Sequence, residues 1–136
     1  MLESSGISLS PEIENRGVLR RQEVAELLRS TDMFLDLSDY QAFGRTGLES
    51  MACGCIPVVP LFGGTNEYAL HGHNAYVVDT RSDEAIMEAV RQFAGLSEEA
   101  RHKIRLNALE TAAEFTIQKA SLSLMRLFRD MAANAN

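Results

Sequence analysis

The sequence predicts an α/β fold with a parallel sheet, followed by a C-terminal part that is wholly helical. Short apolar, strand-like segments alternate with helical segments between residues 22 and 80, and only helical periodicity follows Thr80. Alternation of this kind favours βαβ units, in which consecutive strands run parallel. The 136 residues are expected to form a single domain, because a chain of this length can bury one substantial core.

Three strands are expected, each of them a short apolar segment of the kind that is buried in a sheet. They are residues 32–37, 56–60 and 75–78. Helical segments are expected before and between them, at residues 22–30, 46–53 and 67–70. A loop with Gly63-Gly64 precedes the last of these helices.

Three further helices are expected after Thr80, each with apolar side chains that repeat at helical spacing. Each begins after a residue whose hydroxyl can cap the free N–H groups of a first helical turn. These residues are Ser82, Ser97 and Thr116. The two ends of the chain, residues 1–10 and 132–136, are expected to be flexible tails.

Composition excludes two classes of partner or environment. The net charge is −6 and the arginines are scattered, so the chain offers no basic stripe for the backbone of a nucleic acid. No apolar run approaches the ~20 residues that a membrane span needs. The first residues also lack the basic and then apolar pattern of a signal peptide. We therefore expect a cytoplasmic protein without a transmembrane segment.

Two cysteines, Cys53 and Cys55, are separated by a single residue. That spacing is poor geometry for a disulfide and fits a reducing compartment. His71 and His73 allow a metal site to be drawn together with the cysteines, but C-x-C and H-x-H spacing match no common zinc pattern. No metal is therefore predicted.

A glycine-rich turn is the most informative feature of the chain. Gly44 and Gly47 flank Arg45 and Thr46 immediately before an apolar helical run. At the start of a helix, free backbone N–H groups and the helix dipole face one point in space, which suits an anion such as a phosphate. The turn follows the first predicted strand, and open α/β sheets bind ligands at the carboxyl ends of their strands.

A longer pattern surrounds this turn and extends through the next two predicted strands. It consists of Phe43-Gly44, Gly47 to Gly54, Pro57-Val58-Val59, Gly63-Gly64, Glu67, Gly72 and Asn74. The pattern resembles the C-terminal, donor-binding domain of retaining glycosyltransferases with the GT-B fold, of the large group-4 type. The resemblance covers about residues 16–128, and its specific part is residues 43–74.

The resemblance implies roles for a set of residues around the turn. The donor-binding residues would be Phe43, Gly44, Arg45, Thr46, Gly47 and Glu49. Members of this family carry two glutamates separated by seven residues, the first near the transferred sugar and the second on the nucleotide ribose. Glu49 matches the second glutamate. The first, catalytic position is occupied by Gln41, a departure that removes a negative charge beside the reacting sugar.

The resemblance also implies a fold, a substrate and a partner domain. The fold is a Rossmann-like three-layer sandwich that forms part of a GT-B C-terminal domain. The substrate is a nucleotide-diphosphate sugar, whose sugar is transferred with retained anomeric configuration and without a metal or other cofactor. In GT-B enzymes an N-terminal domain holds most of the acceptor, and these residues show no such domain. The isolated chain is therefore expected to be inactive.

Other interpretations of the same residues stay open at this point. Thr46 and Glu49 form T-x-x-E, the sequence of a capping box, in which Glu49 bonds the Thr46 N–H instead of a ligand. Arg45 is placed either to meet a phosphate or to be solvated. Gln41 and the absent partner domain favour a non-catalytic sugar-nucleotide-binding or interaction module. A dinucleotide oxidoreductase is a weaker third interpretation, because no G-x-G-x-x-G follows a strand.

Overall fold

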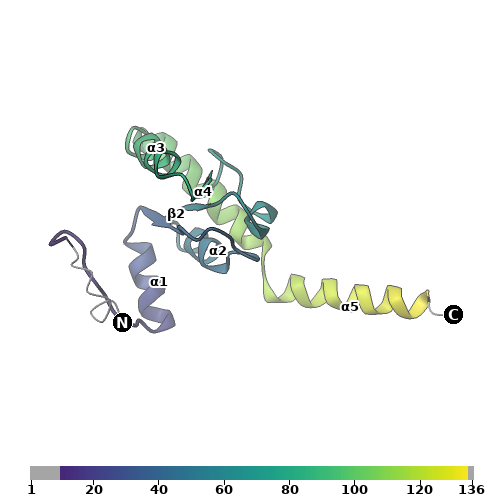
Figure 1. The fold of residues 1–136 in the computed structure, drawn as a ribbon. Coiled ribbons are helices and arrows are strands. Elements are labelled where there is room, and N and C mark those ends of the chain that lie inside the picture. Colours follow the sequence, from purple (N-terminus) through teal and green to yellow (C-terminus); the bar gives the residue numbers. More distant parts are fainter. Residues whose placement is uncertain (1–9, 135–136) are drawn as a thin grey trace.

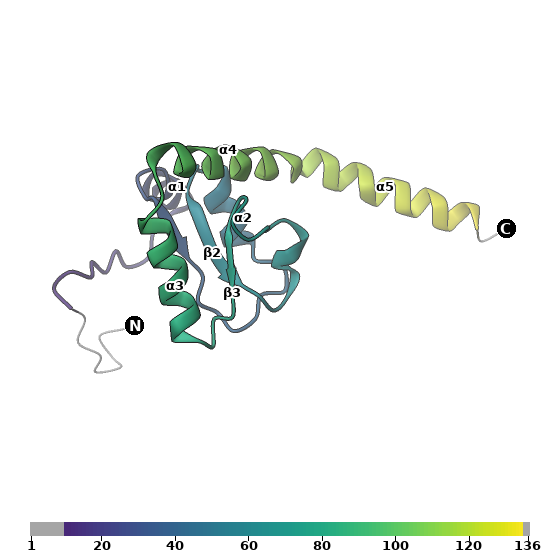
Figure 2. The same ribbon diagram turned by 90° about the horizontal axis from the view of Figure 1, so that it is seen from above.

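A computed structural model describes residues 10–134 of the chain. It contains a parallel three-stranded sheet in the order β1-β2-β3, formed by Met33–Leu35, Ile56–Pro60 and Tyr76–Val78. Helices lie on both faces of this sheet (Figures 1 and 2). The predicted α/β class, with a parallel sheet and a helical C-terminal part, is confirmed.

The described residues also form α-helices and one short 3₁₀ helix. The α-helices are α1 (Arg21–Arg29), α2 (Arg45–Ala52), α3 (Asp83–Ala94), α4 (Glu98–Glu114) and α5 (Ile117–Ala133), and the 3₁₀ helix is η2 (Gly64–Glu67). The predicted N-caps are confirmed, because the hydroxyls of Ser82, Ser97 and Thr116 each accept the backbone N–H three residues ahead. These bonds satisfy donors that the helix itself leaves free.

The short helix predicted at residues 67–70 is wrong, and the 3₁₀ helix lies at Gly64–Glu67 instead. The Asn74 side chain gives the reason. Its Oδ1 accepts the Leu70 N–H at 2.7 Å, and its Nδ2 donates to the Tyr68 carbonyl at 2.9 Å. Because an asparagine side chain mimics the backbone in this way, residues 68–74 fold into a turn rather than a helix.

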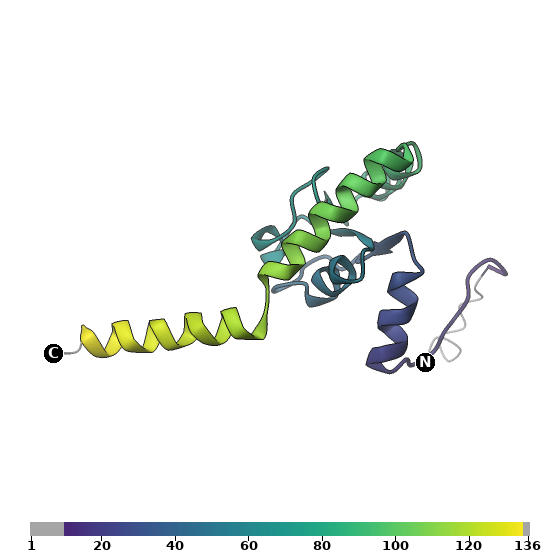
Figure 3. The same cartoon turned by 180° about the vertical axis from the view of Figure 1, so that it is seen from behind.

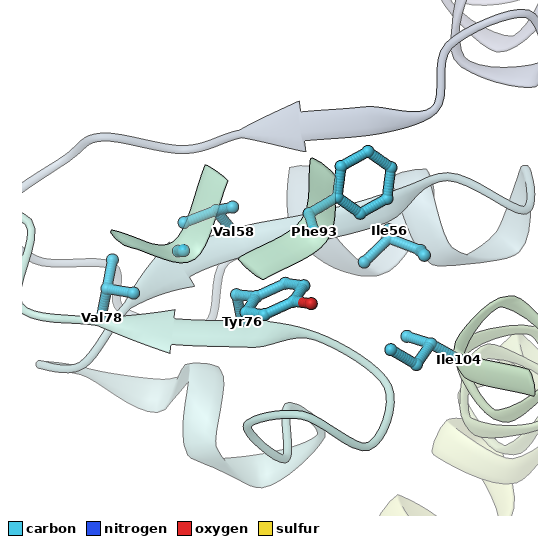
Figure 4. Close-up of a cluster of buried hydrophobic side chains, with 7 residues drawn as sticks. Ile56, Val58, Tyr76, Val78, Phe93 and Ile104 are labelled. Atoms are coloured by element: carbon cyan, nitrogen blue, oxygen red, sulfur yellow. The ribbon is translucent and has the colours of Figure 1, made fainter. Parts of the chain in front are cut away.

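Side chains of the sheet pack on both of its faces, since successive residues of a strand point to opposite sides. One cluster lies between the sheet, α3 and α4, and its members are Ile56, Val58, Tyr76, Val78, Ala89, Phe93 and Ile104 (Figure 4). The cluster that packs against α2 and α4 consists of Met51, Val59, Tyr68, Ala69, Ala75 and Ala108. The sheet is thus the middle layer of a three-layer sandwich (Figure 2).

Strand β2 is buried along its whole length although it contains Pro57 and Pro60. A proline cannot donate a hydrogen bond to a neighbouring strand. The Ile56 N–H points to the β1 side and the Leu61 N–H to the β3 side, so the alternation puts the Pro57 nitrogen toward β3 and the Pro60 nitrogen toward β1. Pro57 precedes the first residue paired with β3, and Pro60 follows the last residue paired with β1. Neither proline therefore occupies a position at which its nitrogen would have to donate a hydrogen bond to a paired strand.

Helix α5 extends away from the sheet, and none of its residues is buried (Figures 1 and 3). Its apolar side chains, among them Ile117, Met125 and Phe128, are exposed. The tail predicted at residues 132–136 overlaps this helix, which continues to Ala133. Otherwise the predicted tails fall mostly outside the described residues. No helix between residues 10 and 134 is both long and apolar enough to cross a membrane.

Candidate functional site

The loops that follow β1 and β2 meet at the carboxyl edge of the sheet. Gln41 forms an isolated parallel bridge with Gly63, and the Gly64 N–H donates to the Gln41 carbonyl at 2.8 Å. A Cβ added at Gly63 would lie 1.9 Å from the Gln41 carbonyl oxygen, and one at Gly64 would lie 2.1 Å from the Ala42 carbonyl oxygen. The two loops approach this closely only because both positions are glycine.

Asp36 directly follows β1 and is only 7% exposed. Its Oδ1 accepts the Ser38 N–H at 3.1 Å and the Ser38 hydroxyl at 2.6 Å. The Gln41 Nε2 donates to Ser38 Oγ at 3.0 Å and, in a longer contact, to Asp36 Oδ1 at 3.4 Å. The Thr46 hydroxyl reaches Asp36 Oδ2 at 3.4 Å. Asp36 therefore connects the predicted catalytic position, Gln41, to the first turn of α2.

Helix α2 begins at Arg45, and its N-cap is Gly44 in a left-handed conformation with φ of 76°. The predicted helix start at Thr46 is wrong by one residue, and the capping-box interpretation, which requires Thr46 itself as the N-cap, is also wrong. Glycine adopts a positive φ without strain, so the chain enters the helix one residue earlier. Thr46 lies inside the first turn with its hydroxyl toward Asp36, and the Glu49 carboxylate pairs with the Arg45 guanidinium at 3.2 Å.

The first turn of α2 presents free backbone donors. The N–H groups of Gly44, Arg45 and Thr46 have no acceptor among residues 10–134, whereas those of Gly47 and Leu48 bond the Gly44 carbonyl at 3.1 and 3.3 Å. The positive end of the helix dipole lies at the same place. Arg45 and Thr46 are exposed, whereas Gly44 is buried, so an anion can reach the N–H groups of Arg45 and Thr46 from solvent.

Tyr68 contacts both glycines of the turn that leads into α2. Its hydroxyl donates to the Gly44 carbonyl at 2.6 Å, and it would lie 2.8 Å from a Cβ added at Gly44 and 2.7 Å from one added at Gly47. Both glycines thus make room for the phenol. Burial, reinforced by the negative charge of Asp36, raises the pKa of Tyr68 to about 12, which keeps the hydroxyl protonated and able to donate.

Phe43 packs its ring into an aromatic cluster at the start of α2. The ring centroids of Phe43 and Tyr68 are 5.5 Å apart with the planes at 60°, and Phe115 lies 5.9 Å from Phe43 and 6.1 Å from Tyr68. Edge-to-face arrangements of this kind are the favoured geometry of aromatic pairs. The cluster joins the glycine turn to the junction between α4 and α5.

A groove of about 290 Å³ runs between α1 and α2. It is lined mainly by apolar side chains, and the full set is Leu19, Arg21, Val24, Ala25, Leu28, Glu49, Ala52 and Cys53. Glu49 contributes to its wall, and the Glu49 side chain is 45% exposed. A larger depression of about 490 Å³ includes Asp32, which precedes β1, and so opens at the amino edge of the sheet, away from the glycine turn.

The histidines that the sequence allows in a metal site have other partners. The Nδ1 of His71 lies 2.9 Å from the Val77 carbonyl oxygen and 3.1 Å from the Val77 nitrogen. The Asn107 amide donates to the His73 carbonyl at 2.9 Å. In the part of the chain that the structure describes, no three or more His, Cys, Asp or Glu residues are grouped as metal ligands.

The structure brings together every residue that the sequence assigns to the site, because Gln41 lies beside the turn and the others occupy the turn or α2. Sequence reasoning missed Asp36, Ser38 and Tyr68. Two polar residues directly after the first predicted strand are a signal that could have found Asp36 and Ser38. No local signal marks Tyr68, because its partner Gly44 lies 24 residues earlier.

A parallel sheet between helical layers, with a glycine turn leading into a helix at its carboxyl edge, defines a Rossmann-like α/β domain. The glycosyl transferases group 1 family matches residues 8–111 of the sequence, and the chain belongs to this family. The expected relation to the C-terminal domain of GT-B glycosyltransferases is confirmed.

Similar proteins agree with this assignment. The GDP-mannose-dependent alpha-(1-6)-phosphatidylinositol dimannoside mannosyltransferase of Mycobacterium tuberculosis is 36% identical over 114 residues, which are 84% of this chain and 29% of the relative. Sucrose-phosphate synthase from Thermosynechococcus elongatus superposes with a TM-score of 0.76 at 20% identity, over 87% of this chain and 30% of that structure. Anabaena HepE, solved with UDP and glucose, superposes with a TM-score of 0.73 at 20% identity, over 81% of this chain and 30% of that structure. The chain thus spans less than a third of each.

Proposed function

We propose that this chain is the donor-binding part of a retaining glycosyltransferase and that it holds a nucleotide-diphosphate sugar at the start of α2. The proposal rests on one observation, which is that three groups suited to a nucleoside diphosphate lie on one helix, α2. Free N–H groups lie at its start, together with the exposed Arg45 guanidinium, and the Glu49 carboxylate follows one turn later. A nucleoside diphosphate suits this order, because its phosphates are anions and its ribose presents two hydroxyl donors.

The diphosphate occupies the donors of the first turn in this proposal. Phosphate oxygens accept hydrogen bonds from free N–H groups at a helix N-terminus, and the helix dipole favours their charge. The Arg45 side chain is 79% exposed, and an exposed ion pair such as the one with Glu49 is broken at a cost of at most about 1 kcal/mol. The guanidinium can then meet a phosphate with two parallel hydrogen bonds. The same donors offset the charge that develops on the diphosphate as the sugar leaves.

The nucleoside occupies the groove between α1 and α2. A carboxylate such as that of Glu49 can accept both ribose hydroxyls in one bidentate contact, and Glu49 is one of the residues that line this groove. Val24 and Leu28 supply apolar surface for a base. The volume of about 290 Å³ is close to the lower size of small-molecule sites, roughly 300 Å³.

The acceptor is held elsewhere in this proposal, by an N-terminal GT-B domain of a longer protein. The names of the similar proteins support a sugar nucleotide as donor, since one is GDP-mannose-dependent and another was solved with UDP and glucose. Positioning of donor and acceptor can lower the barrier to sugar transfer by ~7 to 11 kcal/mol. A domain that holds only the donor cannot position both. We therefore propose that the isolated chain is a cytoplasmic donor-binding protein that transfers no sugar by itself.

A non-catalytic sugar-nucleotide-binding module is the second candidate. The observation that favours it is Gln41, which carries no charge at the position where the family resemblance implies a glutamate. Both candidates require the same donor site. They differ in whether Gln41 supports transfer and whether a partner domain completes a catalytic cleft.

Isothermal titration of the chain with uridine, UDP, guanosine and GDP tests the donor site. We expect one diphosphate to bind with a Kd on the order of 0.1 to 1 mM, or ~4 to 5.5 kcal/mol, and the matching nucleoside to bind at least tenfold more weakly. NAD serves as the control for a dinucleotide site. Equal affinity for nucleoside and diphosphate contradicts the phosphate site, and tighter binding of NAD than of either diphosphate supports an oxidoreductase instead.

A further inference from the structure

Asp36 is a carboxylate that the proposed donor site leaves without a role. It is 7% exposed, yet its Oδ1 lies 3.4 Å from the Nε2 of Gln41. A buried carboxylate is costly unless hydrogen bonds compensate for the lost water, and Asp36 receives them from Ser38, Gln41 and Thr46. The negative charge that is missing at position 41 is therefore present directly behind that side chain.

The hydrogen-bond network sets the orientation of the Gln41 amide. An ionised carboxylate can only accept, so the proton of the Ser38 hydroxyl points to Asp36 Oδ1, 2.6 Å away. With its proton used, Ser38 Oγ can only accept a further hydrogen bond. The Gln41 atom 3.0 Å from Ser38 Oγ must then be the donor Nε2. The amide nitrogen of Gln41 is held inward by this chain of bonds.

The amide oxygen of Gln41 consequently faces outward. No donor of residues 10–134 bonds Oε1. Over the same residues, the buried side-chain N and O atoms without a partner are the Nε atoms of Arg101 and Arg105, so Oε1 is in contact with solvent. Hydrogen bonds that are linked in series polarise one another, and a series that ends on a carboxylate makes this oxygen a stronger acceptor.

We propose that Asp36 is a positioning residue that acts through Ser38 to hold Gln41 Oε1 toward the donor sugar, where this oxygen accepts a sugar hydroxyl. The negative charge of the site stands at Asp36 instead of at position 41. The inference rests on the proposed donor site. It also explains the contact of Asp36 with Thr46, because one carboxylate then sets the sugar-facing Gln41 relative to the phosphate-facing first turn of α2.

Calorimetry on the 136-residue chain tests the inference by comparing UDP with UDP-glucose and GDP with GDP-mannose. In the unmodified chain we expect the sugar to increase affinity in one of the two pairs. Asp36→Asn and Ser38→Ala should each remove about threefold to tenfold of that increment, the worth of one hydrogen bond, and should lower the affinity for the diphosphate by a smaller factor. Asp39→Asn, a change at the exposed carboxylate of the same loop, is the matched control and should keep the increment.

Gln41→Glu tests the effect of a charge at position 41, because glutamate has nearly the same shape as glutamine. It would place a second carboxylate where Nε2 now contacts Asp36, and like charges this close cannot both remain ionised at ordinary pH. We expect Gln41→Glu alone to lose the sugar increment at pH 7. The double variant Asp36→Asn with Gln41→Glu should regain it, because the charge has then moved from position 36 to position 41.

The outcomes distinguish the two proposals. If the unmodified chain binds neither UDP nor GDP, the donor site itself is overturned. If a diphosphate binds but no sugar increases its affinity, the role of Asp36 alone is overturned. The same conclusion follows if Asp36→Asn lowers the affinities for diphosphate and sugar nucleotide by one common factor while the melting temperature falls, since that result describes a structural turn only.

Discussion

Two carboxylates flank the start of α2 in opposite surroundings. Asp36 is 7% exposed and accepts hydrogen bonds from three side chains and one backbone N–H. The Glu49 side chain is 45% exposed and has one side-chain partner within the described residues, Arg45, whose side chain is 79% exposed. The loop region around Asp36 has bonded its polar groups internally, whereas the α2 face with Arg45 and Glu49 keeps its charges available to a ligand.

This difference separates carboxylates whose hydrogen bonds lie within the protein from carboxylates that solvent reaches. A buried network is costly to break, because each group that loses its partner stays desolvated. An exposed ion pair exchanges with water at little cost. Changes in the loop region should therefore alter stability more than diphosphate affinity, and changes on the α2 face should alter diphosphate affinity with little effect on stability.

The largest expected effect is at Gly63, where the two loops meet. Gly63→Ala should lower the free energy of unfolding by about 2 to 5 kcal/mol, since the Cβ meets the Gln41 carbonyl and φ is strained. The backbone φ of Gly63 is 120° and the clash distance is 1.9 Å. Gly72→Ala is the matched control, because Gly72 also has a positive φ of 72° but no atom within 4 Å. Urea denaturation should give a loss of only about 1 kcal/mol for the control, and equal losses would contradict the importance of the close approach.

The next effect in size is on ligand affinity at Glu49. Glu49→Gln should weaken binding of the preferred diphosphate by ~1.5 to 3 kcal/mol, because a charge-assisted contact with the ribose is lost. The melting temperature should barely change. Glu84→Gln is the matched control, since Glu84 is also an exposed helical glutamate paired with an arginine, Arg91, at 2.9 Å. A lower melting temperature with unchanged affinity would assign Glu49 a structural role and weaken the contrast with Asp36.

The smallest of these effects is expected at Tyr68, which belongs to the buried side of the comparison. Tyr68→Phe should cost about 1 to 2 kcal/mol of stability at pH 7, because the Gly44 carbonyl loses its buried donor. Phosphate affinity should fall slightly as the glycine turn loosens. Thermal unfolding of the variant and the unmodified chain, together with UDP and GDP titration, measures both effects.

The pH dependence of stability provides a second measurement on the same variant. Burial raises the pKa of Tyr68 from 10.0 to about 12, so the unfolded chain releases this proton first and stability falls as pH rises from 10 to 12. Burial also raises the pKa of Cys55 from 9.0 to about 11, which adds a loss between pH 9 and 11. In Tyr68→Phe the losses due to Cys55 and to Tyr76, whose pKa burial also raises, should remain. An unchanged profile above pH 11 would show that Tyr68 is not protected by the fold.

The sequence by itself determined the elements whose signals are local. The apolar run Ile56–Pro60 is the central strand over its full predicted length, because continuous β-branched and apolar residues suit a strand that is buried on both faces. The N-caps Ser82, Ser97 and Thr116 could be predicted because a cap bonds a backbone N–H only three residues away. Gln41 and Glu49 could be singled out because their spacing belongs to a contiguous pattern.

The tertiary structure alone decided how these elements make a site. Gly44 sets the start of α2 at Arg45, because its φ of 76° is held by a hydroxyl from Tyr68, 24 residues away. The backbone of Gln41 is fixed at the edge of the sheet because Gly63 and Gly64 allow the loop after β2 to pair with it. Asp36 becomes a buried hydrogen-bond acceptor only when the chain folds. Contacts between distant segments and the loss of water on burial leave no periodic trace in a sequence, whereas helical and strand patterns do.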